Sequence, residues 1–191
     1  MNIYSNMKFA DIVFEGGGVK GIGLVGALKP FEQKGYQWKN ICGNSAGSIV
    51  AALVAVGYTS DEIKKLMIDL EYPKIADKNY SFMPLLSNAS NLLFKKGLFK
   101  GDYIKNWMDE ALSCKLKLCS KKKVTFGDLI IPGEQGILLN NKRYKRKYKL
   151  HIIATDISRG KMIILPEDIA EYGIDPDAQI GRASCRERVF A

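Results

Sequence analysis

The pattern of apolar and polar residues along the chain predicts strands and helices in alternation. Residues 9–14 and 38–42 are short apolar runs that each precede a glycine-rich turn, and both are expected to be strands. Apolar residues then recur with helical spacing over 21–35, where Pro30 should disturb the end of the helix. Residues 46–56 are small and apolar, which predicts a helix that packs closely against a sheet.

The rest of the chain continues this alternation. Thr59 is an N-cap residue followed by acids, so a helix is expected from there to about Leu70. Residues 71–96 are mixed in polarity and rich in Asn and Ser, which indicates a long, lid-like excursion. The later elements expected are a helix from Asp102 to about Leu118, a short helix over 125–131, and strands over 149–155 and 161–165 joined by a turn at 158–160. Alternating strands and helices predict an α/β fold whose mainly parallel sheet is covered on both faces.

The second glycine-rich turn, residues 43–47, has the sequence Gly-Asn-Ser-Ala-Gly and fits the nucleophile-elbow pattern G-x-S-x-G. In such an elbow a serine sits on a sharp turn between a strand and a helix, and small neighbours avoid clashes. Ser45 is therefore the candidate nucleophile. The residues expected to support it are Gly43, Asn44, Ala46 and Gly47. The pattern alone is common and also occurs in packing turns.

The first glycine-rich turn, residues 16–21, has the sequence Gly-Gly-Gly-Val-Lys-Gly. Its backbone N–H groups, at the start of a helix, suit an anion. The predicted oxyanion hole comprises Gly16, Gly17, Gly18 and Val19, with Lys20 and Gly21 in support. The glycines also fit a dinucleotide-binding turn, but the acid expected about 20 residues further on is missing. Since both turns follow predicted strands, they reinforce each other as nucleophile and oxyanion site for acyl transfer.

The histidine content limits the choice of catalytic base. His151 is the one histidine of the chain and lies in an apolar strand, ahead of Asp156. A Ser-His-Asp enzyme of the α/β-hydrolase type has its histidine last, after the acid. We therefore interpret His151 as a structural imidazole and Asp156 as a structural carboxylate, and expect Ser45 to use a different base.

Together these motifs resemble the patatin-like phospholipase family, whose members combine a G-G-G-x-[K/R]-G loop with a G-x-S-x-G elbow and use a Ser-Asp dyad. Residues 97–102, 125–129 and 153–157 are also similar to segments of its bacterial members, so that the resemblance spans about 10–165. It implies a patatin-like three-layer fold and a lipid acyl hydrolase, of phospholipase A or esterase type, that cleaves acyl esters of glycerolipids. The implied partner is a phospholipid or another acyl-ester lipid.

The aspartate of the dyad is expected outside this chain. In the family it lies in a D-G-[G/A] motif downstream of the strand at 149–155, whereas the chain has no Asp-Gly dipeptide. Residues Ile180 to Val189 resemble the translation of a common short-read sequencing adapter. We therefore interpret 1–179 as a partial patatin-like domain without the C-terminal part of the fold, and 180–191 as a non-native read-through tail. A genuine basic tail is the alternative. The chain itself is expected to be inactive.

The composition and charge of the chain limit the classes of partner and cofactor that are expected. The chain has 191 residues and a net charge of +9, carried largely by two lysine-rich runs at 115–123 and 141–149. We interpret both runs as solvated, with binding to anionic lipid as the alternative. No nucleic-acid motif accompanies them. No metal or organic cofactor is expected, because metal-ligand spacing is absent from the four cysteines, which are interpreted as free thiols: Cys42, Cys114, Cys119 and Cys185.

Location and alternative functions follow from the same features. The N-terminal residues do not predict a signal peptide, and the sequence has no apolar run of the roughly 18 residues that span a membrane. We therefore expect a cytoplasmic protein, with peripheral attachment to a membrane surface left open. Two other functions stay open: a catalytically inactive lipid-binding or regulatory domain, and a nucleotide-binding α/β protein that uses the glycine loop.

Overall fold

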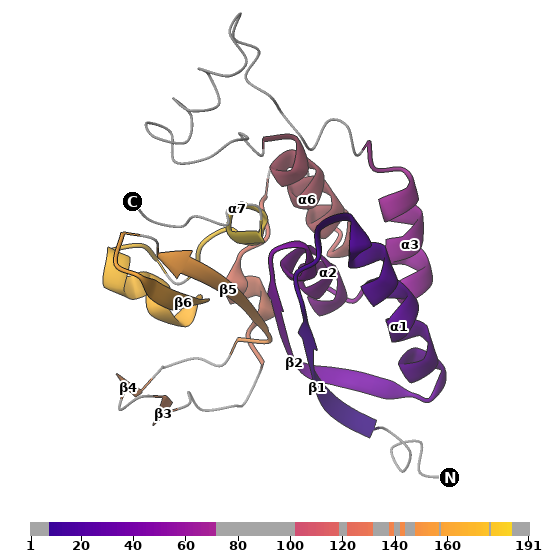
Figure 1. The fold of residues 1–191 in the computed structure, drawn as a ribbon, viewed down its shortest axis with the longest axis horizontal. Helices are drawn as coiled ribbons and strands as arrows, with labels where there is room; N and C mark the ends of the chain where they lie inside the picture. The colour runs from indigo at the N-terminus through magenta and orange to yellow at the C-terminus, as the bar shows by residue number, and fades with distance from the viewer. Residues whose placement is uncertain are drawn as a thin grey trace, which may run out of the picture.

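The computed structural model describes residues 8–71, 102–118, 122–131, 138–139, 142–143, 148–156, 158–175 and 177–184. The predicted lid-like excursion lies outside these residues, apart from Glu71, and so does most of the second lysine-rich run. Helices and strands carry the labels of Figure 1.

A four-stranded sheet lies at the centre of the described fold (Figure 1). It comprises β1 (Lys8–Phe14), β2 (Tyr36–Asn44), β5 (Leu150–Asp156) and β6 (Lys161–Leu165), in the order β1-β2-β5-β6. The first three strands are parallel, and β6 runs antiparallel to β5. The predicted α/β class with a mainly parallel sheet is thus confirmed. Because Phe14 pairs with Gly43 at the ends of β1 and β2, both glycine-rich turns leave the sheet at the same edge.

The strand β2 is longer than predicted and contains an irregularity. Its pairing with β1 shifts between Ala10 and Ile12, so that Ile12 faces Ile41. The Oδ1 atom of Asp11 accepts hydrogen bonds at this point from the backbone N–H of Asn40, at 3.1 Å, and from its Nδ2, at 2.7 Å. These bonds hold the extra residue of β2 in place.

Two α-helices pack directly on the sheet. The helix α1 (Gly21–Gln33) follows a short 3₁₀ helix, η2 (Gly18–Lys20), and contacts β2. The helix α2 (Ala46–Ala55) contacts β1, β2 and β5, and its residues 50–55 are at most 5% exposed, as its small apolar side chains predict. Pro30 was expected to disturb the end of α1 but lies within the helix. The helix continues because the Pro30 carbonyl still accepts a bond from the Lys34 N–H, at 3.2 Å.

The remaining described elements surround α2 and the sheet (Figure 1). The helix α3 (Ser60–Ile68) packs against α1, and α6 (Asp102–Lys115) packs against α2 but ends before the predicted Leu118. The predicted short helix at 125–131 is a 3₁₀ helix, η3 (Phe126–Leu129). The strands β3 (Leu138–Leu139) and β4 (Lys142–Arg143) pair with each other. The last two elements are a 3₁₀ helix, η4 (Glu167–Tyr172), and the helix α7 (Ile180–Ser184), which contacts α6 and α2.

The opposite face of the sheet presents exposed apolar side chains. Val13 of β1 pairs with Cys42, which pairs with His151, and Met162 of β6 pairs with Thr155 on the same face. Val13 is 76% exposed and Met162 is 61% exposed. Of the predicted cover on both faces, α1 and α2 supply that of one face. In the described part of the chain, Val13 and Met162 of the other face lie in solvent.

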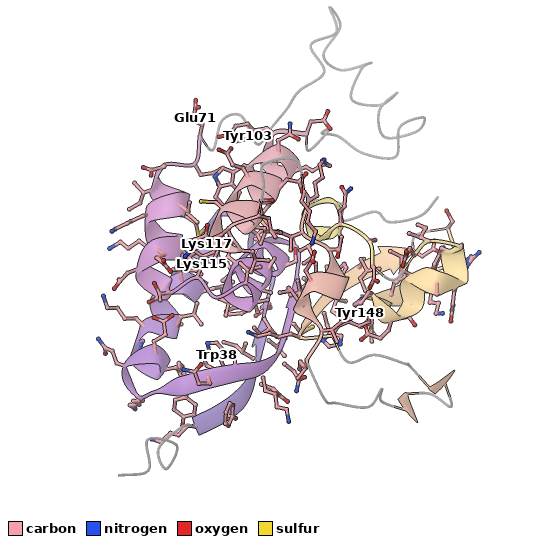
Figure 2. All side chains as sticks on the ribbon, turned by 180° about the vertical axis from the view of Figure 1, so that it is seen from behind. Trp38, Glu71, Tyr103, Lys115, Lys117 and Tyr148 are labelled. Atoms are coloured by element: carbon pink, nitrogen blue, oxygen red, sulfur yellow. The ribbon has the colours of Figure 1, made fainter. Side chains whose placement is uncertain are left out.

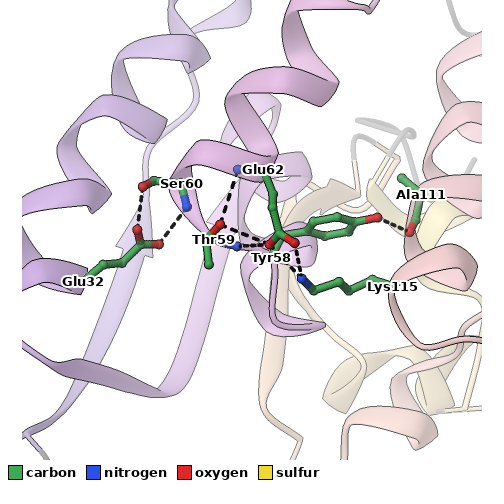
Figure 3. A network of polar contacts seen from close by, with 7 residues as sticks. All are labelled: Glu32, Tyr58, Thr59, Ser60, Glu62, Ala111 and Lys115. Atoms are coloured by element: carbon green, nitrogen blue, oxygen red, sulfur yellow. Dashed lines mark hydrogen bonds and ion pairs between the residues drawn. The ribbon is translucent and has the colours of Figure 1, made fainter.

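A polar network holds α1, α3 and α6 together (Figure 3). The predicted N-cap of α3 is confirmed: the Thr59 side chain accepts from the Glu62 N–H, and the Glu62 carboxylate accepts from the Thr59 N–H at 2.8 Å, which completes a capping box. Next to it, Ser60 donates to the Glu32 carboxylate of α1 from its backbone N–H, at 2.8 Å, and from its hydroxyl, at 2.5 Å. These bonds fix α3 against α1.

The same carboxylate of Glu62 also reaches α6. The Nζ atom of Lys115 lies 2.7 Å from the Glu62 oxygens and 4.7 Å from the centre of the Tyr58 ring, whose hydroxyl donates to the Ala111 carbonyl at 2.8 Å. The hydrogen bond from Lys115 is the main reason that the pKa of Glu62 lies below its usual value. A second contact joins α3 and α6, because the backbone N–H of Glu71 donates to the Tyr103 hydroxyl at 3.2 Å (Figure 2). Glu71 follows the end of α3, and Tyr103 lies at the start of α6.

Several lysines of the first basic run form ion pairs. Besides Lys115, the Nζ of Lys122 lies 2.9 Å from Asp128, and the Nζ of Lys123 lies 3.1 Å from Asp109. These pairs place three of the four described lysines of 115–123 in local contacts at the surface, which favours the solvated interpretation over a continuous lipid-binding patch.

Candidate functional site

Ser45 occupies the turn between β2 and α2, as the elbow pattern predicts. Its φ of 48° and ψ of −129° place a non-glycine residue in a sparsely populated region, and such strain is typical of nucleophile elbows. The Ser45 carbonyl accepts from the backbone N–H of Ser48, at 2.9 Å, and from the Ser48 hydroxyl, at 2.6 Å. Ser48 is 1% exposed, so these two bonds fix the turn from the buried side.

The two elbow glycines are required by close approach of the backbone. A Cβ atom at Gly43 would overlap the carbonyl oxygen of Gly47, and one at Gly47 would overlap the carbonyl oxygen of Phe14. Because Phe14 ends β1, the second overlap shows how tightly the first turn of α2 lies against that strand. The Ala46 Cβ lies in ordinary contact range of Gly21, where an added Cβ would be 3.6 Å away. Small residues at these positions therefore let α1, α2 and β1 converge on Ser45.

The glycine loop lies directly beside the elbow. A Cβ at Gly16 would lie 2.9 Å from the Ser45 Cβ, and the Gly16 N–H donates to the Asn44 side-chain Oδ1 at 2.9 Å. Gly18, with a φ of +56°, opens the 3₁₀ turn, in which the Lys20 N–H donates to the Gly17 carbonyl at 3.2 Å. The two predicted motifs, separated in sequence, thus meet in one place.

The remaining residues of the loop start α1. Val19 forms the middle of the 3₁₀ turn, Lys20 precedes the helix with an exposed side chain, and Gly21 is its buried first residue. The site therefore combines two helix N-termini, those of α1 and α2, at one edge of the sheet. Helix N-termini carry partial positive charge and favour anions.

His151 is held by a carboxylate. His151 of β5 pairs with Cys42 of β2, which lies three residues before Ser45. The Nε2 atom of His151 lies 2.7 Å from Glu167 Oε1. An ionised carboxylate accepts only, so the proton is assigned to Nε2. His151 and Glu167 side chains are 21% and 12% exposed. The bond to Glu167 ties β5 to η4.

Asp156, at the end of β5, is also fully engaged. It is 1% exposed and accepts from the Tyr172 hydroxyl, at 2.8 Å, and from the Arg159 N–H, at 3.1 Å. Burial raises the pKa of the Asp156 carboxyl, but these hydrogen bonds outweigh it, so that the pKa lies below its usual value. The Arg159 guanidinium stacks over the Tyr172 ring at 4.7 Å and encloses the group. Such a carboxylate ties the β5–β6 turn to η4, as a structural residue does.

Metal and thiol chemistry find no support in the described residues. These residues contain no cluster of three or more His, Cys, Asp or Glu side chains that could hold a metal ion. Cys42 is half-buried and Cys114 is exposed, and both are free thiols, whereas Cys119 and Cys185 lie outside the described part. Burial raises the pKa of the Cys42 thiol. Among the helices described, none has the length and apolar character needed to cross a membrane.

Comparison with known proteins identifies the family. A family model described as patatin-like phospholipase matches residues 12–173. The chain therefore belongs to the patatin-like phospholipase family, and lipid hydrolysis is the activity of its class at family level.

Curated relatives support the same stretch of sequence. The chain is 40% identical over 182 residues to the protein YqhO of Bacillus subtilis, which covers 93% of this chain and 55% of that protein. It is 29% identical over 146 residues to a protein of Acanthamoeba polyphaga mimivirus, which covers 74% of this chain and 45% of that protein. The chain thus spans about half the length of the curated relatives it matches.

Solved structures share the fold. The effector ExoU of the Pseudomonas aeruginosa type III secretion system, solved in complex with SpcU, superposes with a TM-score of 0.58 at 21% identity, over 97% of this chain and 39% of that one. A second structure of ExoU gives a TM-score of 0.54 at 22% identity, over 94% and 38%. At this identity the likeness supports the fold, and the patatin-like architecture predicted from the motifs is confirmed.

Proposed function

We propose that the protein is a lipid acyl hydrolase, of phospholipase A or esterase type, that cleaves acyl esters of glycerolipids with Ser45 as nucleophile. One observation carries this proposal: the glycine loop touches the elbow, with Gly16 packed against the Ser45 Cβ. Acyl transfer needs a nucleophile and a set of oxyanion donors within reach of one carbonyl group. Two separate turns that meet at a strained serine support this arrangement.

The reaction begins with attack of the Ser45 hydroxyl oxygen on the acyl carbonyl carbon, while its proton passes to a base. The resulting oxyanion is stabilised by backbone N–H groups of Gly17 and Gly18 and by the N-terminal end of α2. Collapse of the tetrahedral intermediate breaks the ester bond, and the alcohol leaves with the proton. Water then hydrolyses the acyl-enzyme and restores Ser45. Loss of one oxyanion donor typically costs about 3–4 kcal/mol of transition-state stabilisation.

The base is proposed to be the aspartate of a Ser-Asp dyad that lies outside residues 1–191. Within the described part of the chain, His151 is bound to Glu167, and Asp156 is buried under Tyr172 and Arg159. In the proposed reaction neither group takes the proton of Ser45. The proposal therefore implies that residues 1–191 alone have negligible esterase activity, and that the intact gene encodes an Asp-Gly-Gly or Asp-Gly-Ala motif beyond codon 179. Sequencing the locus tests this implication directly.

The exposed Lys20 at the start of α1 supports a phospholipid substrate. Its ammonium group stands next to the glycine loop in sequence, where it is proposed to support the loop or to interact with a headgroup phosphate. A phospholipid at a peripheral membrane surface is accordingly the proposed partner. No metal or organic cofactor enters the proposed reaction.

Substitution of the nucleophile tests the function. In the complete gene product, Ser45→Ala should abolish hydrolysis of a short-chain nitrophenyl ester and of a phosphatidylcholine vesicle, while circular dichroism stays unchanged. Ser158→Ala is the control, because it removes an exposed serine hydroxyl from the turn between β5 and β6, away from the elbow. Turnover that survives in Ser45→Ala would refute the assignment. Binding of phosphatidylcholine vesicles by a wild-type protein that hydrolyses no ester would favour the lipid-binding alternative.

A further inference from the structure

The side chain of Asn44 connects the two halves of the site. Its Oδ1 accepts the Gly16 N–H at 2.9 Å, across 28 residues of sequence. Asn44 is the last residue of β2 and directly precedes Ser45, whereas Gly16 lies two residues beyond the end of β1. The bond therefore fixes the start of the glycine loop to the residue beside the nucleophile. It also engages the Gly16 N–H, which leaves Gly17, Gly18 and Val19 among the predicted oxyanion donors.

The loop needs such a contact because its own backbone is permissive. Three consecutive glycines can adopt many conformations, including left-handed ones such as that of Gly18. At its far end the loop is held by the 3.2 Å bond from the Lys20 N–H to the Gly17 carbonyl. At its near end it is held by Asn44 and by the contact of Gly16 with Ser45. The loop is thus held at both ends.

We propose that Asn44 is a positioning residue, whose carboxamide sets the distance between the oxyanion donors of Gly17 and Gly18 and the nucleophile Ser45. This inference rests on the proposed acyl hydrolase function. Asn44 touches neither the substrate nor the reacting atoms, and acts through the backbone of the loop. Its side chain is exposed, so its hydrogen bond is not needed to satisfy a buried polar group. Loss of the bond should therefore affect the transition state much more than the stability of the fold.

Kinetics of two Asn44 variants in the complete gene product test the inference. Asn44→Leu keeps the size of the side chain but removes the acceptor. We expect its kcat on a nitrophenyl ester to fall by about 10- to 100-fold, the range expected when a catalytic group is displaced by about 1 Å, with KM changed less than about twofold. Asn106→Leu, the same change on the exposed surface of α6, is the control and should leave both constants unchanged. Asn44→Asp retains an acceptor for the Gly16 N–H.

Amide hydrogen exchange supplies a readout that is independent of turnover. Exchange of the Gly16 N–H should accelerate by at least about tenfold in Asn44→Leu and stay close to the wild-type rate in Asn44→Asp, since only the first variant lacks the acceptor. If Asn44→Leu fails to fold, the slow exchange expected in Asn44→Asp still tests the bond, and fast exchange there would contradict it. Unchanged kcat in a folded Asn44→Leu, or a rise in KM alone, would overturn the inference. In either case an inactive Ser45→Ala would leave the proposed function intact, whereas an active one would refute that function instead.

Discussion

The pair of His151 and Glu167 offers a quantitative test of which groups serve the fold and which serve the reaction. The Nε2–H of His151 donates to Glu167 Oε1 at 2.7 Å, and in the described part of the chain the other carboxylate oxygen of Glu167 is buried without a hydrogen-bond partner. Replacing His151 by Leu would leave this carboxylate buried and unpaired. Replacing Glu167 by Met would leave an unpaired imidazole N–H. Replacing both removes the polar pair altogether.

The expected magnitudes follow from the burial of the two side chains. Breaking a fully buried ion pair typically costs about 3–5 kcal/mol. Since His151 is 21% exposed and Glu167 is 12% exposed, we expect a loss of about 2–3 kcal/mol in unfolding free energy for His151→Leu. Glu167→Met should cost about 1–2 kcal/mol, because the imidazole N–H loses its acceptor. The double variant should lie within about 1 kcal/mol of the wild type, since apolar residues of similar size often replace a buried pair without loss.

Urea unfolding of the four proteins, each as the complete gene product, measures these differences in unfolding free energy, and ester hydrolysis by the same preparations measures the catalytic effect. Below the unfolding transition, kcat should be the same in all four, because His151 is assigned a structural role. A folded His151→Leu protein that loses turnover by more than about 100-fold, the lower range for removal of a general base, would identify His151 as the base of Ser45. Additive losses in the double variant would show that the two side chains do not act as a pair.

Three further changes test other parts of the structure. Gly47→Ala should destabilise the fold by about 1–3 kcal/mol, because its Cβ would overlap a backbone carbonyl of β1. Gly26→Ala, on the exposed side of α1, should instead stabilise the fold by about 0.5–1 kcal/mol. Thermal unfolding compares the two variants. Thr59→Ala should cost about 1 kcal/mol in urea unfolding through loss of the capping box, and an unchanged midpoint would contradict the cap. The lowered pKa of Asp156 stabilises the fold above the usual carboxyl pKa, and this contribution is lost as the pH falls through the lowered value. Tyr172→Phe should therefore move the acid-unfolding midpoint to higher pH, and a midpoint that stays in place would contradict this role of the hydroxyl.

The elements next to the site could be predicted from the sequence because their signals are local. A strand, a glycine-rich turn and a small-residue helix follow one another within about 20 residues, and the glycines record where backbones approach too closely for a side chain. Gly43 and Gly47 illustrate this, since an added Cβ at either would overlap a carbonyl group. The N-cap of α3 at Thr59 was predictable for the same reason, because both partners of the capping box lie within one turn.

Contacts between distant segments were not predictable in this way. The bond from the Gly16 N–H to Asn44 joins residues 28 apart in the sequence. The presence of an asparagine in an elbow does not indicate which group its side chain will bind. The bulge at Asn40 depends on Asp11 across the strand pair, and the direction of β6 depends on its short turn from β5. In each case the residue types are ordinary, and the structure alone brings them together.

The difference between local signals and contacts of distant segments also explains why a nucleophile is easier to propose for this site than a base. Ser45 is recognisable because an elbow imposes conformational demands on its immediate neighbours, and those demands exclude most residue types from the adjacent positions. A base makes no such demand, since any carboxylate or imidazole that the fold carries to the hydroxyl can serve. His151 and Asp156 show that a titratable group near the sheet edge is insufficient, because hydrogen bonds to Glu167 and Tyr172 commit both side chains to the fold. We therefore propose that the partner of Ser45 is neither of these two groups.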